Sequence, residues 1–354
     1  MFLLSEWEHL CSFLSAFFLS KWQQFCDHWK KVCAVSIILV FWLICPISGT
    51  AIPLCLLFSD SQSSTLIFIG VSIVWAYFSQ NIPERGGLPM DWSRTCWPWP
   101  VIRDYFSHKI VKTAELPPNR SYLIGSHPHG ILHVGGTLTF AGKVSGFNDL
   151  FPGLTQCILT LQGQFRWPYR RETMMFIGVN SCSPDSIEYL LNNPGPGRAV
   201  ALVIGGLSES LMSRPGRYDI KIKNRKGFVR QALIHGADLV PCYHFGEVDI
   251  FDHEKGNDEK KVKNMQAHIR NVIGFLPPFL KGSSIFGCGL PGLMPFQRPI
   301  TSVIGAPIAV TRKEHPSEEE VDALHEKYCA ALCELFENHK HRHGIPEDAH
   351  LNIF

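Results

Sequence analysis

The chain has 354 residues, of which 45% are hydrophobic and 18% are charged, and its formal net charge is +2. So small a charge, without a basic cluster that alternates with aromatic residues, argues against nucleic acid as a partner. Twelve cysteines are scattered between Cys11 and Cys333 without a Cys-x-x-Cys pair. This spacing argues against a zinc site, a redox pair and a disulfide scaffold, and it predicts reduced, cytosol-facing thiols with neither metal nor bound cofactor.

Residues 1–31 form a candidate cytosolic amphipathic segment. Aromatic residues recur from Trp7 to Trp29 and three lysines accompany them, a composition that is typical of a helix lying in the membrane interface. A cleaved signal peptide is not expected, because Glu6 and Glu8 stand where such a peptide carries basic residues.

Residues 32–82 are interpreted as a membrane hairpin with arms at about 32–58 and 65–80. The first arm is uncharged but interrupted by prolines, and the second is short for a complete span. Lysines precede the pair and arginines follow it, while the connector has neither, so the positive-inside rule places both ends in the cytosol. Whether the hairpin spans or dips into the bilayer stays open, and a core hairpin of a soluble enzyme is the alternative.

Residues 83–120 are rich in proline, tryptophan and arginine and are interpreted as an interfacial linker. Trp92, Trp97 and Trp99 suit a collar at the membrane surface, although ordinary packing under a long loop explains them nearly as well.

Residues 121–354 alternate between strand and helix patterns and are expected to form one cytosol-facing domain. Runs of valine, isoleucine and leucine between helices indicate an α/β fold with a mostly parallel central sheet. The expected strands are 122–125, 173–179, 199–204, 238–243 and 301–304. The expected helices are 185–191, 228–235, 262–272 and 317–340, the last beginning with a serine cap and three glutamates.

The first expected strand of this domain ends in Ser126-His127-Pro128-His129-Gly130. Strand ends of α/β sheets are where enzymes place chemistry, and imidazoles exchange protons near neutral pH. Proline and glycine restrict the turn, so the two rings are held in place. His127 and His129 are therefore candidate catalytic residues, with Pro128 and Gly130 shaping the substrate site.

Two further segments carry candidate site residues. Another expected strand ends in Gly205-Gly206 followed by Glu209, where glycines let backbone N–H groups approach a substrate; a plain turn with an exposed glutamate explains it equally well. The segment Arg225-Lys226-Gly227-Phe228 with Arg230 begins an expected helix, where cations and the helix dipole can hold phosphates, although a solvated basic turn is the simpler reading. Glu247 follows the next strand and is a candidate to orient an imidazole or to lie on the surface.

Other patterns in the sequence are weaker indications of function. Residues 287–292 fit a dinucleotide-binding pattern, but a proline stands inside the would-be helix, so a loop is expected. Ser208 only loosely imitates a nucleophile elbow, which keeps a serine lipid hydrolase as one alternative. A non-catalytic lipid-droplet anchor is the other alternative.

The chain resembles the acyl-CoA:diacylglycerol acyltransferase type 2 family, which includes monoacylglycerol and wax-alcohol acyltransferases. The resemblance runs from about Arg103 to Pro346 and depends on an ordered set of motifs. These are Arg103-Asp104-Tyr105-Phe106, Val111-Lys112-Thr113, His127-Pro128-His129-Gly130, Gly205-Gly206-x-x-Glu209-Ser210, Arg225-x-Gly227-Phe228 with Val240-Pro241 and Phe245-Gly246-Glu247, and Pro299-Ile300-Thr301 with Gly305-x-Pro307-Ile308.

The resemblance implies an endoplasmic-reticulum membrane enzyme that reaches lipid droplets. It implies acyl transfer from acyl-CoA, as co-substrate, to the hydroxyl of a neutral lipid, most typically diacylglycerol. Monoacylglycerol and long-chain alcohols stay open as acceptors, as do acyl-chain preference and a homo-oligomeric state. Two positions depart from the family: Ser107 stands where a proline is common, and Leu207 where alanine is usual.

The mechanism implied is general-base catalysis without an acyl-enzyme. His129 is preferred as the base, because the family keeps the second histidine where the first is replaced by glutamate. The position of His127 at the strand end instead resembles the histidine of the His-x-x-x-x-Asp acyltransferases, but Leu132 stands at the aspartate position. Glu209 is expected to orient the base or the acceptor, and Arg225, Lys226 and Arg230 to bind coenzyme A phosphates.

Overall fold

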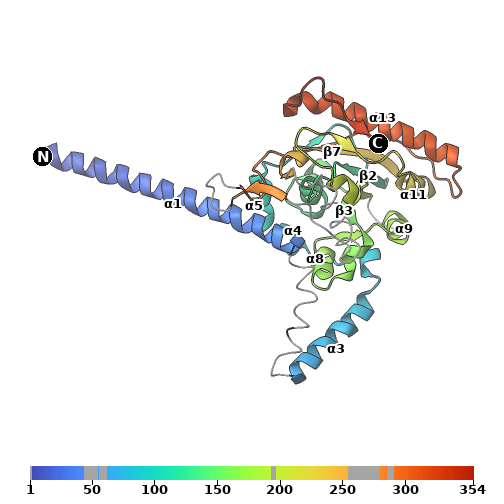
Figure 1. Ribbon diagram of the computed structural model, residues 1–354, viewed down its shortest axis with the longest axis horizontal. Helices are drawn as coiled ribbons and strands as arrows, with labels where there is room; N and C mark the ends of the chain where they lie inside the picture. The colour runs from blue at the N-terminus through green and yellow to red at the C-terminus, as the bar shows by residue number, and fades with distance from the viewer. Residues whose placement is uncertain (1, 44–54, 56–61, 193–196, 254–279, 285–290) are drawn as a thin grey trace.

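The computed structural model describes residues 2–43, 55, 62–192, 197–253, 280–284 and 291–354. A seven-stranded sheet lies at the centre of the domain, in the order β1-β11-β7-β2-β5-β3-β4 (Figure 1). Its strands are β1 (Lys109–Lys112), β2 (Tyr122–His127), β3 (Thr155–Thr160), β4 (Val179–Ser181), β5 (Arg198–Leu202), β7 (Asp238–Phe245) and β11 (Thr301–Ile304). Neighbours are parallel except β11 and β7, which are antiparallel. The expected α/β fold is confirmed.

Helices cover both faces of this sheet, because successive strand residues face opposite sides. Leu123 packs in one core with α9 (Pro184–Asn192), α11 (Gly227–His235) and α13 (Glu318–Lys340). Tyr122 and Ile124 pack in the other core with α5 (Pro98–Tyr105), η2 (Thr137–Ala141) and α7 (Phe147–Leu150). Figure 1 shows α13 stretched along one side of the sheet, with α11 beside its end.

Short elements complete the fold. They are η1 (Ile82–Glu84), α6 (Val134–Gly136), η3 (Gln162–Arg166), α10 (Gly206–Ser210), β6 (Asp219–Ile220), η4 (Glu247–Asp249), β8 (Asp252–His253), β9 (Leu280–Ser283), β10 (Pro291–Gly292), η6 (His341–His343) and β12 (Asn352–Ile353). Strands β10, β9 and β8 form a small sheet, and β12 pairs with β6.

One expected strand, 173–179, is wrong. That segment forms α8 (Arg170–Phe176), and β4 begins only at Val179. The run Thr173-Met174-Met175-Phe176 is apolar and fits either structure, but methionine favours helices, and Gly178 at φ +78° turns the chain after the helix. The expected helices at 185–191, 228–235 and 317–340 correspond to α9, α11 and α13. The expected helix at 262–272 and most of the loop at 287–292 lie outside the described residues.

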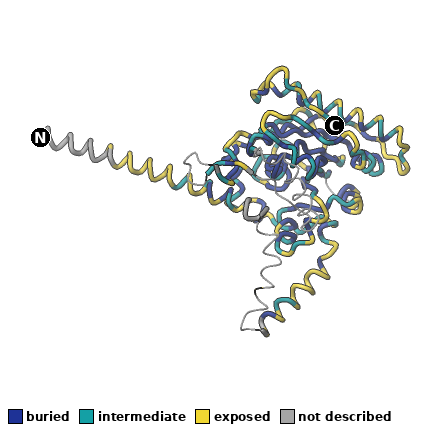
Figure 2. The backbone as a smooth tube through the Cα atoms, in the orientation of Figure 1, coloured by how far each residue is buried: buried dark blue, intermediate teal, exposed yellow. Residues whose placement is uncertain are grey.

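The N-terminal segment is one helix, α1 (Phe2–Leu43), which continues across residues 31 and 32. Aromatic side chains from Phe13 to Trp29 are exposed, as the yellow stretch in Figure 2 shows, whereas Ala34 and Val35 are buried against α5. The beginning of the expected first membrane arm therefore packs on the domain. The rest of that arm, from residue 44 to 58, lies outside the described residues, apart from residue 55.

The second expected arm corresponds to α3 (Gln62–Ser79), whose described side chains are mostly exposed (Figure 2). Among the described residues, one helical segment, Thr65–Glu84, is long and apolar enough to cross a membrane.

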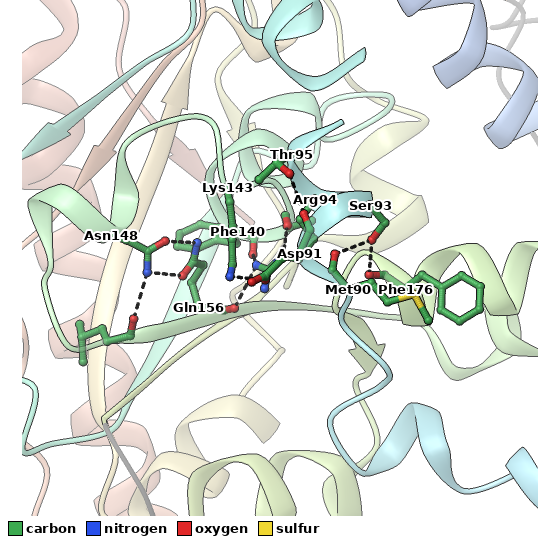
Figure 3. A network of polar contacts seen from close by, with 12 residues as sticks. Met90, Asp91, Ser93, Arg94, Thr95, Phe140, Lys143, Asn148, Gln156 and Phe176 are labelled. Atoms are coloured by element: carbon green, nitrogen blue, oxygen red, sulfur yellow. Dashed lines mark hydrogen bonds and ion pairs between the residues drawn. The ribbon is translucent and has the colours of Figure 1, made fainter. Parts of the chain in front are cut away.

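The linker after α3 is tied to the domain through α4 (Asp91–Thr95). The buried Arg94 guanidinium donates to the carbonyl oxygens of Ala141 at 2.6 Å, Phe140 at 3.2 Å and Gln156 at 3.4 Å (Figure 3). Of the three candidate collar tryptophans, Trp92 and Trp97 are exposed, while Trp99 is buried and donates to the Ser93 carbonyl. The linker is thus part of the folded unit.

Candidate active site

His127 is the last residue of the buried central strand β2 and has no exposed surface. Its Nε2 lies 3.0 Å from the hydroxyl of Tyr328 on α13, and its Nδ1 has no hydrogen-bond partner within the described part of the chain. Burial lowers the pKa of His127 to about 3, so the ring is neutral. A Cβ on Gly125 would lie 1.8 Å from the Tyr328 oxygen, so only glycine there lets Tyr328 reach the histidine.

His129 is half-buried as a residue, whereas His127 is completely buried. Its Nδ1 lies 3.0 Å from the Gly130 carbonyl oxygen. Because a carbonyl only accepts hydrogen bonds, Nδ1 carries the hydrogen and Nε2 keeps the lone pair. Burial lowers the pKa of His129, with small opposing effects of its hydrogen bonds. The ring is thus a neutral imidazole with a basic nitrogen.

Glu209 lies on α10 and is buried beneath this turn. One carboxylate oxygen accepts from the backbone N–H of His129, and the other accepts from the N–H of Lys221 at 3.0 Å. Burial raises the pKa of Glu209, against the effect of these hydrogen bonds. A Cβ on Gly205 would lie 1.9 Å from the carboxylate, so this glycine lets Glu209 fold back onto the strand end. The glycine–glutamate motif and the two-histidine motif are therefore in contact, because the Glu209 carboxylate holds the backbone of His129.

Arg225 joins the same end of the sheet but points inward. Its guanidinium donates to the Ile204 carbonyl at 2.6 Å and to the Ser208 hydroxyl at 3.0 Å, and it faces Gly206, which has φ +57°. Ser208 in turn contacts the Gly205 carbonyl at 3.4 Å. Among the described residues, Ser208 contacts Arg225 and the Gly205 carbonyl and no imidazole, so this serine lacks there the base that a nucleophile requires.

Lys226 and Arg230, the other two cations predicted for the site, face α13. Lys226 pairs with Asp322 and Arg230 pairs with Glu318, each at 2.6 Å, which connects the start of α11 to α13. Phe228 is buried and packs edge-on against Tyr328, and Gly227 is the first residue of α11. Phe228 therefore packs on the tyrosine that contacts His127, while Lys226 and Arg230 form ion pairs with α13.

Glu247 follows β7 and is buried. Its carboxylate accepts from the backbone N–H groups of Val134 at 2.8 Å and Gly135 at 2.7 Å. Burial raises its pKa to about 8. Glu247 thus holds the loop that follows the histidines rather than an imidazole. Gly130, at φ +56°, gives it room, since a Cβ would lie 2.6 Å from Glu247 Cγ.

A further polar group was missed from the sequence. His133, His244 and His108 lie behind His129 and are buried with the hydroxyls of Ser126 and Ser302. Burial lowers the pKa of His133 and His108 to about 3 and holds the pKa of His244 well below its usual value. The signal available was the alternation in β7, which places Cys242 and His244 on the same face of the sheet. No group of three or more potential ligands among the described residues is placed to hold a metal ion.

Comparisons with known proteins show what this chain is similar to. The sequence profile of the family described as "Diacylglycerol acyltransferase" matches residues 56–354. Mouse (Mus musculus) diacylglycerol O-acyltransferase 2 is 38% identical over 305 residues, covering 86% of this chain and 78% of that protein. Human (Homo sapiens) 2-acylglycerol O-acyltransferase 3 is 39% identical over 320 residues, covering 90% and 92%.

A solved structure is also similar, the 1-acyl-sn-glycerophosphate acyltransferase of Thermotoga maritima. It has 12% identity and a TM-score of 0.38, over 87% of this chain and 97% of that one. At this TM-score the likeness supports no further argument.

Proposed function

This chain belongs to the diacylglycerol acyltransferase family, and we propose that it transfers a fatty acyl group from acyl-CoA to diacylglycerol, giving triacylglycerol. The observation that carries the proposed chemistry is the state of His129: neutral, half-buried, and with Nδ1 committed to the Gly130 carbonyl. This leaves Nε2 as the basic nitrogen of that ring.

In the proposed reaction, Nε2 of His129 takes the hydroxyl proton as the acceptor oxygen attacks the thioester carbonyl. The tetrahedral intermediate collapses with cleavage of the carbon–sulfur bond, and the imidazolium returns its proton to the leaving thiolate of coenzyme A. Such general-base assistance typically contributes about 10²–10⁴-fold. Backbone N–H groups beside Gly130 and Gly205 are the candidate donors to the oxyanion.

His127 has a supporting part in this proposal, since it is completely buried and its Nε2 faces Tyr328. Glu209 holds the backbone of His129 in place. We assign the phosphates of coenzyme A to the start of α11, where Lys226 and Arg230 are half-exposed. Phosphates bound there compete with Asp322 and Glu318 for the two cations. Arg225 instead holds the end of the strand through the Ile204 carbonyl.

A second acceptor, 2-monoacylglycerol, is favoured by one observation. The match to human 2-acylglycerol O-acyltransferase 3 covers 92% of that protein, at an identity equal to that of the diacylglycerol enzymes. A panel with labelled acyl-CoA and diacylglycerol, monoacylglycerol or a long-chain alcohol separates these activities. Labelled triacylglycerol as the main product supports our proposal, and preferred esterification of monoacylglycerol or alcohol contradicts it.

Location is part of the proposal. The exposed aromatic face of α1 and the apolar α3 support attachment to the cytosolic side of the endoplasmic-reticulum membrane, with access to lipid droplets.

The catalytic assignment is tested with His129→Ala and Tyr328→Phe in microsomes at matched protein levels. We expect His129→Ala to lose about 10²–10⁴-fold in turnover. Tyr328→Phe removes the hydroxyl that contacts His127 and leaves His129 untouched, so activity stays within about threefold of wild type. Near-normal turnover of His129→Ala, with His127→Ala inactive, would reverse the assignment. Inactivation by a fluorophosphonate that labels Ser208 would favour a hydrolase instead.

A further inference from the structure

Five buried side chains form a continuous hydrogen-bonded chain behind His129. His133 Nε2 lies 2.9 Å from the Ser126 hydroxyl, which lies 2.7 Å from His244 Nε2. His244 Nδ1 lies 2.7 Å from the Ser302 hydroxyl, which lies 2.9 Å from His108 Nε2. Each of the five side chains is at most 6% exposed. Burying polar atoms is costly unless they find partners, and both ring nitrogens of His133 and of His244 have one, so the geometry of these two rings is tightly specified. At the far end of the chain, His108 Nδ1 has no partner among the described residues.

One carbonyl sets the direction of every hydrogen bond. His133 Nδ1 lies 3.1 Å from the Pro128 carbonyl oxygen, which can only accept, so Nδ1 carries the hydrogen of this neutral ring. Nε2 of His133 is then an acceptor, and the Ser126 hydroxyl donates to it.

The same reasoning continues along the chain. Ser126 has given its single hydrogen to His133, so it accepts from His244 Nε2–H. The Ser302 hydroxyl therefore donates to His244 Nδ1 and accepts from His108 Nε2–H. The buried Thr139 hydroxyl also lies 2.9 Å from Ser302, and it donates to the Gly135 carbonyl at 2.7 Å. From His108 to Pro128, every donor points toward the turn that carries His129.

This chain ends on the peptide group that positions the base. The Pro128 carbonyl accepts from His133, and the N–H of the same peptide group, on His129, donates to Glu209. Both ends of the peptide group are therefore held, and its plane sets the direction in which His129 leaves the backbone. The rings of His129 and His133 lie 5.8 Å apart between centroids, so His133 lies beside the base.

We propose that His133 is a positioning residue for His129, and that the Ser126–His244–Ser302–His108 chain holds His133 in the tautomer that this requires. The inference rests on the proposed function, in which His129 is the base. The proposed reaction releases no net proton, because the acceptor proton leaves on the thiol of coenzyme A. The chain therefore has an orienting role, and no proton has to travel along it.

The test uses Ser126→Ala and Ser302→Ala, which cut the chain at two places with a loss of one oxygen each, in the full-length membrane enzyme. Each variant should lower kcat at least tenfold, while KM for acyl-CoA changes less than threefold. The double variant should be no slower than the worse single variant, because either cut frees the same ring. The acid limb of the pH–rate profile should stay at the same pH while the plateau falls.

The matched control is His325→Gln. This histidine is also buried and contacts a backbone carbonyl, that of Ile222 at 3.0 Å, but it packs on the opposite face of the sheet. Its turnover should stay within about twofold, and its melting temperature measures what loss of a buried histidine does to the fold. Should Ser126→Ala fail to accumulate, Ser302→Ala alone decides.

Unchanged kcat in Ser302→Ala, or additive losses in the double variant, overturns the inference. If His129→Ala is inactive while both serine variants are normal, only this inference fails. If His129→Ala is active, the proposed function itself fails.

Discussion

At the scale of single residues, the site depends on three glycines, whose lack of a side chain leaves room for a neighbouring group. Gly125, Gly130 and Gly205 each lie where a Cβ would enter Tyr328, Glu247 or Glu209 respectively. Glu209 and Glu247 hold the backbone of the turn and of the loop after it, and Tyr328 contacts the His127 ring. The sequence shows glycines beside histidines, but it does not show which side chain fills the space above each of them.

Gly130→Ala tests this point. Its φ of +56° disfavours any Cβ by about 1–2 kcal/mol, and the clash with Glu247 adds to that. We expect a lower melting temperature and at least a tenfold loss of acyl transfer. Gly216→Ala is the control, since its φ of +73° is similar but nothing lies within 4 Å. It should destabilise the fold without reducing kcat, and equal activity of both variants would contradict the role of Gly130.

At the scale of elements, the linker and the domain form one folded unit through α4. Arg94 is 4% exposed and donates to three carbonyl oxygens of two other segments (Figure 3). The neighbouring ion pair of Asp91 with Lys143 is on the surface, where such pairs contribute little. The buried arginine is therefore the structural anchor of the segment.

Arg94→Met should lower the free energy of unfolding by about 1–3 kcal/mol or more, because buried carbonyls lose their donors. Asp91→Asn, which breaks only the surface pair, should leave the melting temperature unchanged. Thermal unfolding of the detergent-purified variants measures both. A melting temperature of Arg94→Met equal to that of Asp91→Asn would show that α4 is held by other contacts.

Several elements could be predicted from the sequence because their signals are local. The Val/Ile/Leu run of β2 and the Ser317 capping box of α13 are visible in a few residues. The strands β1 and β3 were missed, since Lys109 and Lys112 flank only two apolar residues in β1 and β3 starts and ends with threonine. The histidine chain depends on β11 pairing antiparallel with β7, which sets Ser302 opposite His244. Strand order is a tertiary property that no local pattern carries.

At the scale of the whole molecule, burial of neutral histidines makes the fold sensitive to acid. The pKa of His108, His127 and His133 falls from about 6.5 in an unfolded chain to about 3. A depressed pKa gives stability that is present above pH 6.5 and is lost as the pH falls toward 3. Glu247, with its pKa raised to about 8, acts in the opposite sense, but the histidines outnumber it.

We therefore expect the melting temperature of the purified enzyme to fall between pH 6.5 and pH 5. Each buried histidine removes about 1.4 kcal/mol per pH unit once the unfolded form is protonated. A His108→Gln variant has one titrating group fewer, so its stability should depend less steeply on pH. A flat profile in wild type over this range would contradict the burial of these rings.

The packing of α1 on the domain bears on the distance between His129 and the membrane surface. Ala34 and Val35 lie in the same core as Tyr122 and Ile124 of the strand that carries the histidines. The exposed aromatic part of α1 extends from that core (Figure 2). If this part rests on a membrane, as proposed, the distance of His129 from the lipid is set by the packing of α1 on the domain. A change in bilayer thickness would then alter the depth of α3 in the membrane. The distance between the membrane surface and His129, which an acceptor hydroxyl has to cover, would stay the same.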